Sequence, residues 1–157
     1  YVLVNIGILD KPYNFLTQPF AAKMVILLGL LWRWTGYNMV FFLSGLQNIE
    51  YSVYEAAKID GASAIQTFFK ITVPLLKPTI LLTAIMSTNG TLQLFDESIN
   101  LTDGGPANAS ISMSHYIYNL CFKYVPNFGY AAAMSFFILL LVAVLAFIQM
   151  RVGDKRD

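Results

Sequence analysis

The segment YAAAMSFFILLLVAVLAFIQM, residues 130–150, carries no acidic or basic side chain. The nearest charged residues along the chain are Lys123 before it and Arg151 after it. A helix that crosses the hydrocarbon core of a bilayer needs about 20 mostly apolar residues. This segment has that length and composition, so it predicts a transmembrane helix and makes a membrane the solvent for the rest of the chain.

The overall composition agrees with a membrane protein. Of the 157 residues, 57% are hydrophobic and 12% are charged, and the formal net charge is +1. Soluble domains contain roughly 45–50% apolar and about 25% charged residues. No basic stripe is present to neutralise phosphates, which excludes nucleic acid as a partner. The single cysteine, Cys121, excludes an intrachain disulfide and a thiolate metal cluster, and we interpret it as an inert buried thiol.

Two further segments predict membrane spans. Met24–Leu46 is apolar apart from interruptions such as Arg33. Leu75–Phe95 begins beside two prolines, and a proline in the first turn of a helix costs little. The expected fold is therefore all-α: a polytopic membrane protein with three transmembrane helices at about 24–46, 75–95 and 130–150.

The chain begins at Tyr1 rather than at methionine, and no basic segment precedes an apolar run as in a signal peptide. Tyr1–Leu9 is too short to span a bilayer, so we interpret it as the end of an earlier helix. We expect the N-terminus to be truncated, and residues 1–157 to be the C-terminal part of one larger transmembrane domain.

Lysine and arginine residues in short loops set the orientation of a membrane protein, because they stay on the cytoplasmic side. The loop Asp96–Ser114 contains acidic residues and no basic one. We therefore expect this loop outside, and residues 47–74 and the C-terminus in the cytoplasm. The basic residues are Lys58, Lys70 and Lys77 between the first two spans, and Arg151, Lys155 and Arg156 after the third.

The external loop contains the dense turn sequence LTDGGP at residues 101–106. After it, His115–Lys123 predicts a short interfacial helix with aromatic anchors. His115 is the only histidine, and we interpret it as a structural hydrogen-bonding residue. No credible set of nucleophile and base accompanies it, so the sequence does not indicate an enzyme.

Residues 51–73 predict a cytoplasmic helix-turn-helix. Tyr51–Asp60 is compatible with a helix, and Gly61 can adopt the positive φ that ends one. Ser63 is suited to cap a second, amphipathic helix, which Pro74 is expected to stop before the next span begins. An amphipathic helix exposed in the cytoplasm needs a groove to receive its apolar face.

The stretch EAAKIDGASAIQTFFKITVPLLKP, residues 55–78, resembles the EAA motif of the permease subunits of binding-protein-dependent ABC importers. The order E-A-A-x-x-D-G-A is present, followed by an apolar end and proline. Flanking sequences resemble the carbohydrate-uptake branch, of the maltose and glycerol-3-phosphate type. These are WTGYNM (34–39), SGLQ (44–47), LTDGGP (101–106) and FGYA (128–131), and the resemblance covers about Trp32 to Met150. Glu50 departs from it, because that branch usually has proline there.

The resemblance implies a multi-pass transport subunit in the inner (plasma) membrane of a prokaryote, importing sugars or oligosaccharides. It also implies that the 51–73 segment docks on a cytoplasmic ATPase subunit and couples it to the spans. The other implied partners are a second permease subunit, an extracytoplasmic solute-binding protein and membrane lipid. The residues implied in coupling are Glu55, Ala56, Ala57, Asp60, Gly61, Ala62, Phe68, Phe69 and Pro74.

No G-x-x-x-x-G-K-[ST] phosphate loop occurs in the sequence. We therefore expect this chain to bind no cofactor or metal and to have no ATPase activity, with ATP and Mg bound by the partner. Glu55 is expected to pair with a partner arginine. Asp60 has two interpretations of equal weight, a contact with the partner or a hydrogen-bond acceptor for backbone donors at the turn.

Polar and small residues interrupt the first two spans, where polar groups are costly unless they face protein or water. We expect them to line the solute pathway, although packing between helices is an equal alternative for Asn89 and Thr91. Arg33 has a further interpretation, as a side chain that snorkels to the outer surface. The expected pathway residues are Trp34, Gly36, Asn38, Ser87, Asn89, Gly90 and Thr91.

Two other functions compete with the importer. A fragment of a secondary transporter would need a buried ionisable residue in mid-span, and only Arg33 qualifies. A non-transporting membrane adaptor would use the 51–73 segment to bind another cytoplasmic protein. An interfacial helix pair lying on the membrane would be richer in Lys and Arg than this segment is.

The charge asymmetry generates a prediction about topology. A cysteine introduced at Gly105 should react with an impermeant thiol reagent from outside the cell, and one at Ser63 only after the cytoplasmic side is opened. Labelling before and after permeabilisation makes the measurement. The opposite pattern would overturn both the orientation and the cytoplasmic docking role.

Overall fold

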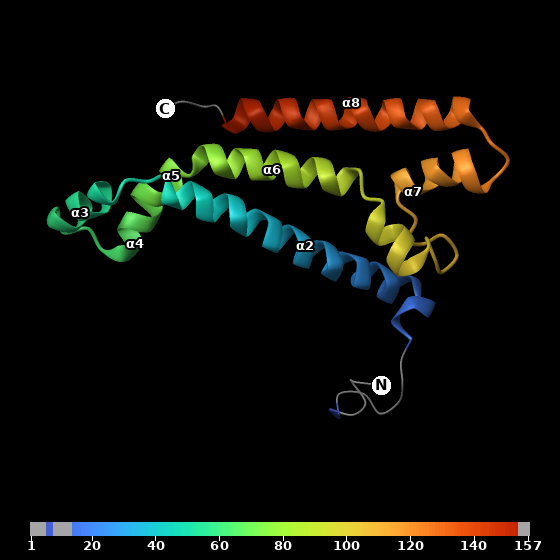
Figure 1. Ribbon diagram of the computed structural model, residues 1–157, viewed down its shortest axis with the longest axis horizontal. Coiled ribbons are helices and arrows are strands. Elements are labelled where there is room, and N and C mark those ends of the chain that lie inside the picture. The colour runs from blue at the N-terminus through green and yellow to red at the C-terminus, as the bar shows by residue number, and fades with distance from the viewer. Residues whose placement is uncertain (1–5, 8–13, 154–157) are drawn as a thin grey trace. The chain divides into compact units, whose positions relative to one another are not determined.

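The computed structural model describes residues 6–7 and 14–153, and every regular element in this part of the chain is helical. The expected all-α fold is therefore confirmed (Figure 1). The elements are η1 (Phe15–Thr17), α2 (Pro19–Gln47), α3 (Tyr51–Ile59), α4 (Ala64–Thr67), η2 (Phe68–Thr72), α5 (Val73–Leu75), α6 (Lys77–Leu92), η3 (Ser98–Thr102), α7 (Met113–Tyr118), η4 (Asn119–Lys123) and α8 (Phe128–Gly153). The interpretation of Tyr1–Leu9 as the end of a helix falls outside the described residues, except for Ile6 and Gly7.

Two of these helices, α2 and α8, are long and apolar enough to cross a bilayer by themselves. α8 contains the whole segment 130–150 and extends beyond it at both ends. α2 begins at Pro19, ahead of the expected start at Met24, because proline fits the first turn of a helix, where its missing N–H would have no partner. The structure has a third candidate span only if the bent helix pair Ala64–Leu75 and Lys77–Leu92 is counted as a single crossing.

The second expected span differs from the structure at both ends. α6 begins at Lys77 and ends at Leu92 rather than continuing to Phe95. Its 16 residues make a helix about 24 Å long, which is shorter than the hydrocarbon core of roughly 30 Å.

Pro74 does not stop the helical segment that begins at Ala64, contrary to the expectation from the sequence. The helical chain from Ala64 continues through Pro74 to Leu75, and the bend of 64° follows at Leu76. The preceding turn, η2, is π-helical, and the N–H of Val73 bonds to the carbonyl of Phe68, five residues back. A wide turn of this kind already lacks the usual bond pattern, so proline can follow it without breaking a helix.

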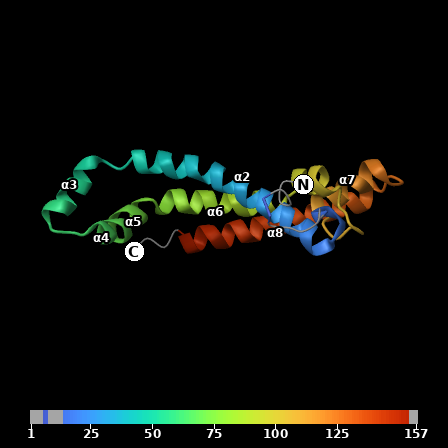
Figure 2. The ribbon, with the colours of Figure 1, turned by 90° about the horizontal axis from the view of Figure 1, so that it is seen from below.

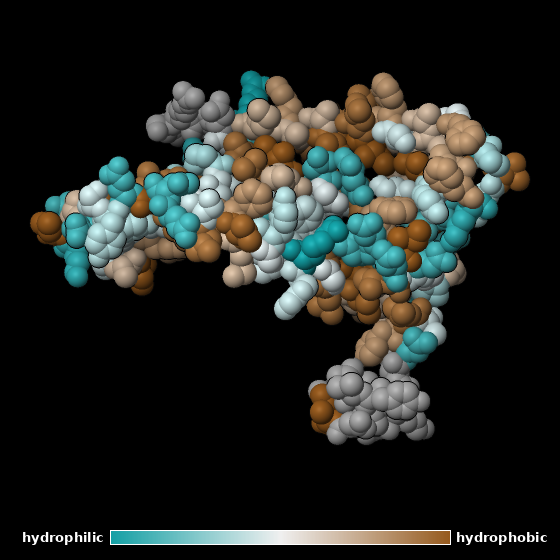
Figure 3. Space-filling model, in the orientation of Figure 1, coloured by the Kyte–Doolittle hydropathy of each residue, from teal (hydrophilic) through white to brown (hydrophobic). Residues whose placement is uncertain are grey.

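The chain divides into two compact units. The first, the spanning unit, contains residues 32–92 and 136–157. Within it α6 lies between α2 and α8 in both views (Figures 1 and 2). Gly45 on α2 allows α2 to lie close to α6, because a Cβ at Gly45 would be 2.8 Å from Oγ1 of Thr79 on α6. Hydrophobic side chains cover much of the visible face of α8, as expected for a lipid-facing helix (Figure 3).

The second unit, the loop unit, contains residues 1–31 and 93–135. His115 on α7 is fully buried in it, 2.9 Å through Nδ1 from Ser98 Oγ. The Ser98 hydroxyl donates its proton to the Ser110 carbonyl at 2.9 Å, so Nδ1 of the neutral imidazole must carry the other proton and donate to Ser98. The expectation that His115 is a structural hydrogen-bonding residue is confirmed.

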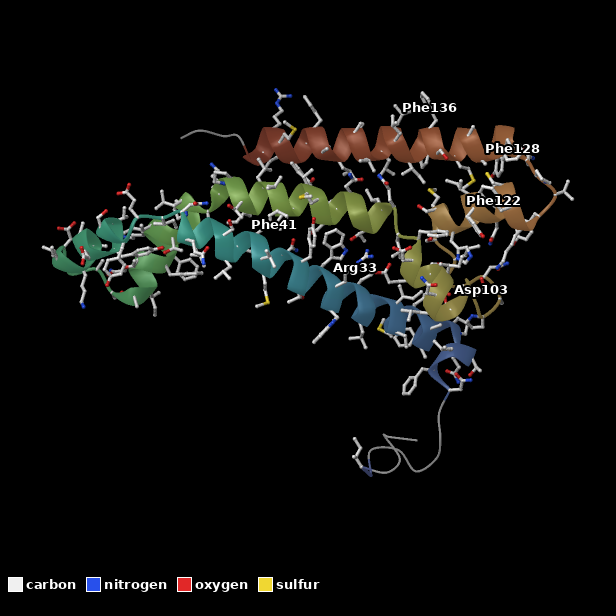
Figure 4. All side chains as sticks on the ribbon, in the orientation of Figure 1. Arg33, Phe41, Asp103, Phe122, Phe128 and Phe136 are labelled. Carbon is white, nitrogen blue, oxygen red and sulfur yellow. The ribbon has the colours of Figure 1, made fainter. Side chains whose placement is uncertain are left out.

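The other ring nitrogen of His115, Nε2, lies near an ion pair between Asp103 and Lys123. Nε2 is buried without a hydrogen bond in the described part of the chain and lies 3.7 Å from Asp103 Oδ1. Asp103, labelled in Figure 4, also bonds to Lys123 Nζ at 2.7 Å. That bond lowers the pKa of Asp103 and raises the pKa of Lys123. Burial lowers the pKa of His115, and the charge of Asp103 opposes this effect without reversing it.

These directions generate a prediction about acid stability. Because the pKa of His115 in the folded protein lies below its ordinary value of 6.5, the unfolded chain takes up this proton first as the pH falls. The stability contributed by neutral His115 is present above about pH 6.5 and is lost below it.

The thermal midpoint of the purified protein between pH 7.5 and 5 measures this effect. His115→Gln, which keeps a donor for Ser98 and cannot titrate, should lose less stability over that range than the parent. Equal losses in the two proteins would show that His115 contributes nothing to acid sensitivity.

Candidate functional site

Local rules of helix capping form a helical hairpin, which is made of α3, α4, η2 and α5. Gly61 has a φ of +76° and forms the turn after α3, as expected. Ser63 caps α4 through a reciprocal pair, since its hydroxyl accepts from the N–H of Gln66 and its own N–H donates to Gln66 Oε1 at 2.8 Å. The expected cap is confirmed, and both ends of the turn are held in place.

A hydroxyl contact closes the hairpin at the other end. Tyr54 on α3 lies 3.3 Å through its hydroxyl from Thr72 Oγ1, a side chain that is buried. An open hollow of ≈ 470 Å³ lies between the two arms, and Lys58 is the one charged residue among the described residues that line it. Its lining residues are Tyr54, Lys58, Ala62, Ala64, Thr67, Phe68 and Thr72. The hairpin therefore offers a hollow as well as an outer surface to a partner.

The structure separates the expected coupling residues by exposure. Glu55, Ala56 and Asp60 are exposed, whereas Ala57 is buried, with 5% of its surface exposed. The Asp60 side chain makes no hydrogen bond in the described part of the chain, which leaves its carboxylate available to a partner. Pro74 belongs to α5, past the end of the hairpin turn.

Two phenylalanines supply the apolar part of this surface. Phe68 and Phe69 are 51% and 65% exposed, with their ring centroids 5.0 Å apart in an edge-to-face arrangement. Apolar side chains at such exposure indicate an interaction surface. Gly61 and Ala62 lie in the turn between the arms, and Pro74 lies in α5, so all the expected coupling residues belong to the hairpin.

The expected pathway residues form two contacts between α2 and α6. Trp34 lies against Gly90, where a Cβ would come within 2.6 Å of Trp34 Cη2. Trp34 Nε1 is buried and has no acceptor in the described part of the chain. One turn away, Asn38 Nδ2 donates to Ser87 Oγ at 3.0 Å, and the Ser87 hydroxyl returns a bond to Asn38 Oδ1 at 3.3 Å.

The other expected pathway residues, Gly36, Asn89 and Thr91, do not take part in these two contacts. Gly36 faces open space, because nothing lies within 4 Å of the position of its Cβ. Asn89 and Thr91 are exposed on α6. Arg33, labelled in Figure 4, has its guanidinium 5.5 Å from the Trp34 ring centroid, a contact that holds the cation near the aromatic face.

One polar contact was not anticipated. Gln149 Nε2 on α8 donates to Thr88 Oγ1 on α6 at 2.8 Å. The signal in the sequence was Gln149 itself, a strongly polar side chain within the apolar run 130–150. Together with the Asn38–Ser87 pair, this bond ties α6 to both of its neighbours in the spanning unit.

Comparisons with known proteins agree with this arrangement. Residues 1–156 match the family described as binding-protein-dependent transport system inner membrane component. The chain is 54% identical over 156 residues to the lactose transport system permease protein LacF of Rhizobium radiobacter, covering 98% of this chain and 52% of that protein.

Solved structures show the same fold. A bacterial ABC transporter involved in the import of the acidic polysaccharide alginate matches with a TM-score of 0.81 and 25% identity, covering 97% of this chain and 52% of that one. The alginate transporter in complex with an alginate pentasaccharide-bound periplasmic protein matches with a TM-score of 0.70 and 25% identity, covering 98% and 51%. The chain spans about half the length of the proteins it matches.

The Trp34–Gly90 contact generates a prediction about packing. Gly90→Ala would place a methyl group into the Trp34 ring and should cost about 1–3 kcal/mol through overpacking. Thermal midpoints of the purified protein measure the loss. Gly36→Ala is the matched control, because its Cβ would meet open space and should not destabilise.

A double variant tests the cause. Trp34→Phe shortens the ring that faces Gly90, so Gly90→Ala should cost less when combined with it than when made alone. Additive losses in the two variants would contradict the contact between these residues.

Proposed function

This chain belongs to the family of binding-protein-dependent transport system inner membrane components, and from that membership we propose that it forms part of the permease subunit of an ATP-driven importer. The proposed solutes are sugars or oligosaccharides, since the relatives include a lactose permease and an alginate importer. Membership also places the chain in a prokaryotic plasma membrane, in agreement with its apolar helices.

The observation that carries the proposal is the capped hairpin joined to the start of α6. Exposed Glu55 and Asp60 flank the Gly61 turn, and exposed Phe68 and Phe69 lie on the arm that leads toward the span. We infer that these residues dock on a cytoplasmic ATPase subunit. Movement of that subunit would then reach α6 through α5, which is separated from α6 by Leu76 alone.

The proposed solute route follows the polar stretch of α6. Asn38 and Ser87 bond to each other between α2 and α6, and Asn89 and Thr91 are exposed on the same helix as Ser87. Polar side chains at membrane depth need protein or water beside them. We therefore assign Asn89 and Thr91 to the solute pathway, and Trp34, Gly36 and Gly90 to its wall.

In the proposed importer, ATP binding, solute delivery and the transport pathway belong to different subunits. The sequence has no phosphate loop, so ATP and Mg would bind to the partner ATPase, and this chain would act as a transport subunit without catalysis. A solute-binding protein fits the family description, and a periplasmic protein accompanies the alginate transporter. A second permease subunit would complete the pathway. Family membership does not favour the secondary transporter or the adaptor.

The coupling role generates a prediction for Glu55 and Gly61. Glu55→Ala should remove a charge-assisted bond and leave a partner arginine unpaired, a loss of about 1.5–3 kcal/mol and tenfold or more in docking. Gly61→Val should weaken docking as well, because a β-branched residue is strained at a φ of +76°. Both variants should insert normally, bind less ATPase on co-purification and lose uptake of labelled sugar.

Two controls sharpen this experiment. Ser52→Ala changes an exposed residue of the same helix and should keep both ATPase and uptake. Gly61→Asn tolerates positive φ, so it should retain more ATPase than Gly61→Val if backbone strain is the cause. Normal uptake by well-expressed Glu55→Ala and Gly61→Val would show that the hairpin is not the coupling element.

A further inference from the structure

The bond between Gln149 and Thr88 puts a strongly polar side chain into the contact between α6 and α8. Gln149 Nε2 donates to Thr88 Oγ1 at 2.8 Å, and the contact is partly buried. A leucine at this position of α8 would pack against α6 with no polar group to satisfy. Polar side chains within membrane helices are costly and mark functional positions. The proposed transport function has so far given Gln149 no role.

The position of Thr88 on α6 lets this bond control the rotation of the helix. Successive residues of an α-helix point about 100° apart. Ser87 bonds to Asn38 on α2, and the next residue, Thr88, bonds to Gln149 on α8. In the spanning unit α6 lies between these two helices (Figures 1 and 2). One bond alone would let α6 turn about that contact, whereas bonds to both neighbours hold its rotation.

The next residue along α6 is Asn89, so the two bonds also set the direction of its side chain. A small cavity of ≈ 30 Å³ lies between α6 and α8, and its lining includes Thr88, Asn89 and Gln149. It has room for about one or two water molecules and is too small for a sugar. The helix α8 therefore packs closely behind this part of α6, while the Asn89 side chain remains exposed.

We propose that Gln149 is a positioning residue for the solute pathway. Through its bond to Thr88 it holds α6 at the rotation that presents Asn89 to the pathway. This inference rests on the assignment of Asn89 to the pathway in the proposed function. It does not depend on which solute is carried, so it can be tested without knowing the sugar.

Thiol labelling of the complete transporter in membrane vesicles tests the proposal. Asn89→Cys, made together with Cys121→Ser, leaves one thiol within residues 1–157. A small water-soluble methanethiosulfonate reagent is added, and mass spectrometry of this subunit gives the reaction rate. Gln149→Met keeps the length of the side chain and removes the amide donor. It should slow the reaction about threefold, the typical effect of one hydrogen bond between membrane helices. A merely structural role would leave the rate unchanged or raise it, because loosened packing admits more reagent.

A second variant and a matched control identify the bond as the cause. Thr88→Val removes the acceptor with little change of shape and should slow the reaction as much as Gln149→Met does. The two changes together should be no slower than either alone, because both remove the same bond. Ser135→Ala is the control on α8, since the Ser135 hydroxyl bonds to the Ala131 carbonyl of its own helix, and it should leave the rate unchanged.

The outcomes separate this inference from the function on which it rests. An unchanged or faster reaction in Gln149→Met would overturn the positioning role alone, and so would additive effects of the two changes. No reaction of the Asn89→Cys thiol in any of these proteins would overturn the assignment of Asn89 to the pathway, and the positioning role with it.

Discussion

Hydrocarbon leaves polar groups without water, and this constraint governs how the spanning helices hold together. Backbone groups are satisfied within each helix, so side chains decide which helices pair. The Asn38–Ser87 pair joins α2 to α6, and the Gln149–Thr88 bond joins α8 to α6. Glycines complete the arrangement, since Gly45 and Gly90 admit neighbouring side chains that a Cβ would displace. In the spanning unit, α6 is therefore the element on which both other helices depend.

The sequence predicted those features that depend on local composition. The run 130–150 is uniformly apolar, and α8 contains it, because length and composition alone set a span. Gly61 and Ser63 behave as expected because the left-handed turn and the capping box need only neighbouring residues. The prediction that Pro74 ends a helix was wrong, because the effect of this proline depends on the π-helical turn before it. Residue identities do not reveal such a turn.

In the candidate sites, too, local features were predictable from the sequence and tertiary contacts were not. Phe68 and Phe69 belong to the amphipathic pattern recognised in the sequence, and they are exposed, whereas nothing in that pattern indicated the burial of Ala57. Trp34 and Gly90 were each singled out from the sequence, but their contact joins residues far apart in the chain and comes from tertiary packing. Spacing along one helix carries no information about which side chain from another helix will lie opposite.

The one-residue junction at Leu76 has a mechanical consequence. Between α5 and α6 the chain has two soft dihedral angles and no slack, and Leu76 itself is only 7% exposed. A flexible linker would absorb a displacement of the hairpin by changing its own shape. A short, buried junction cannot change its shape in this way. A tilt of the hairpin would therefore rotate the first turn of α6 about the 64° bend.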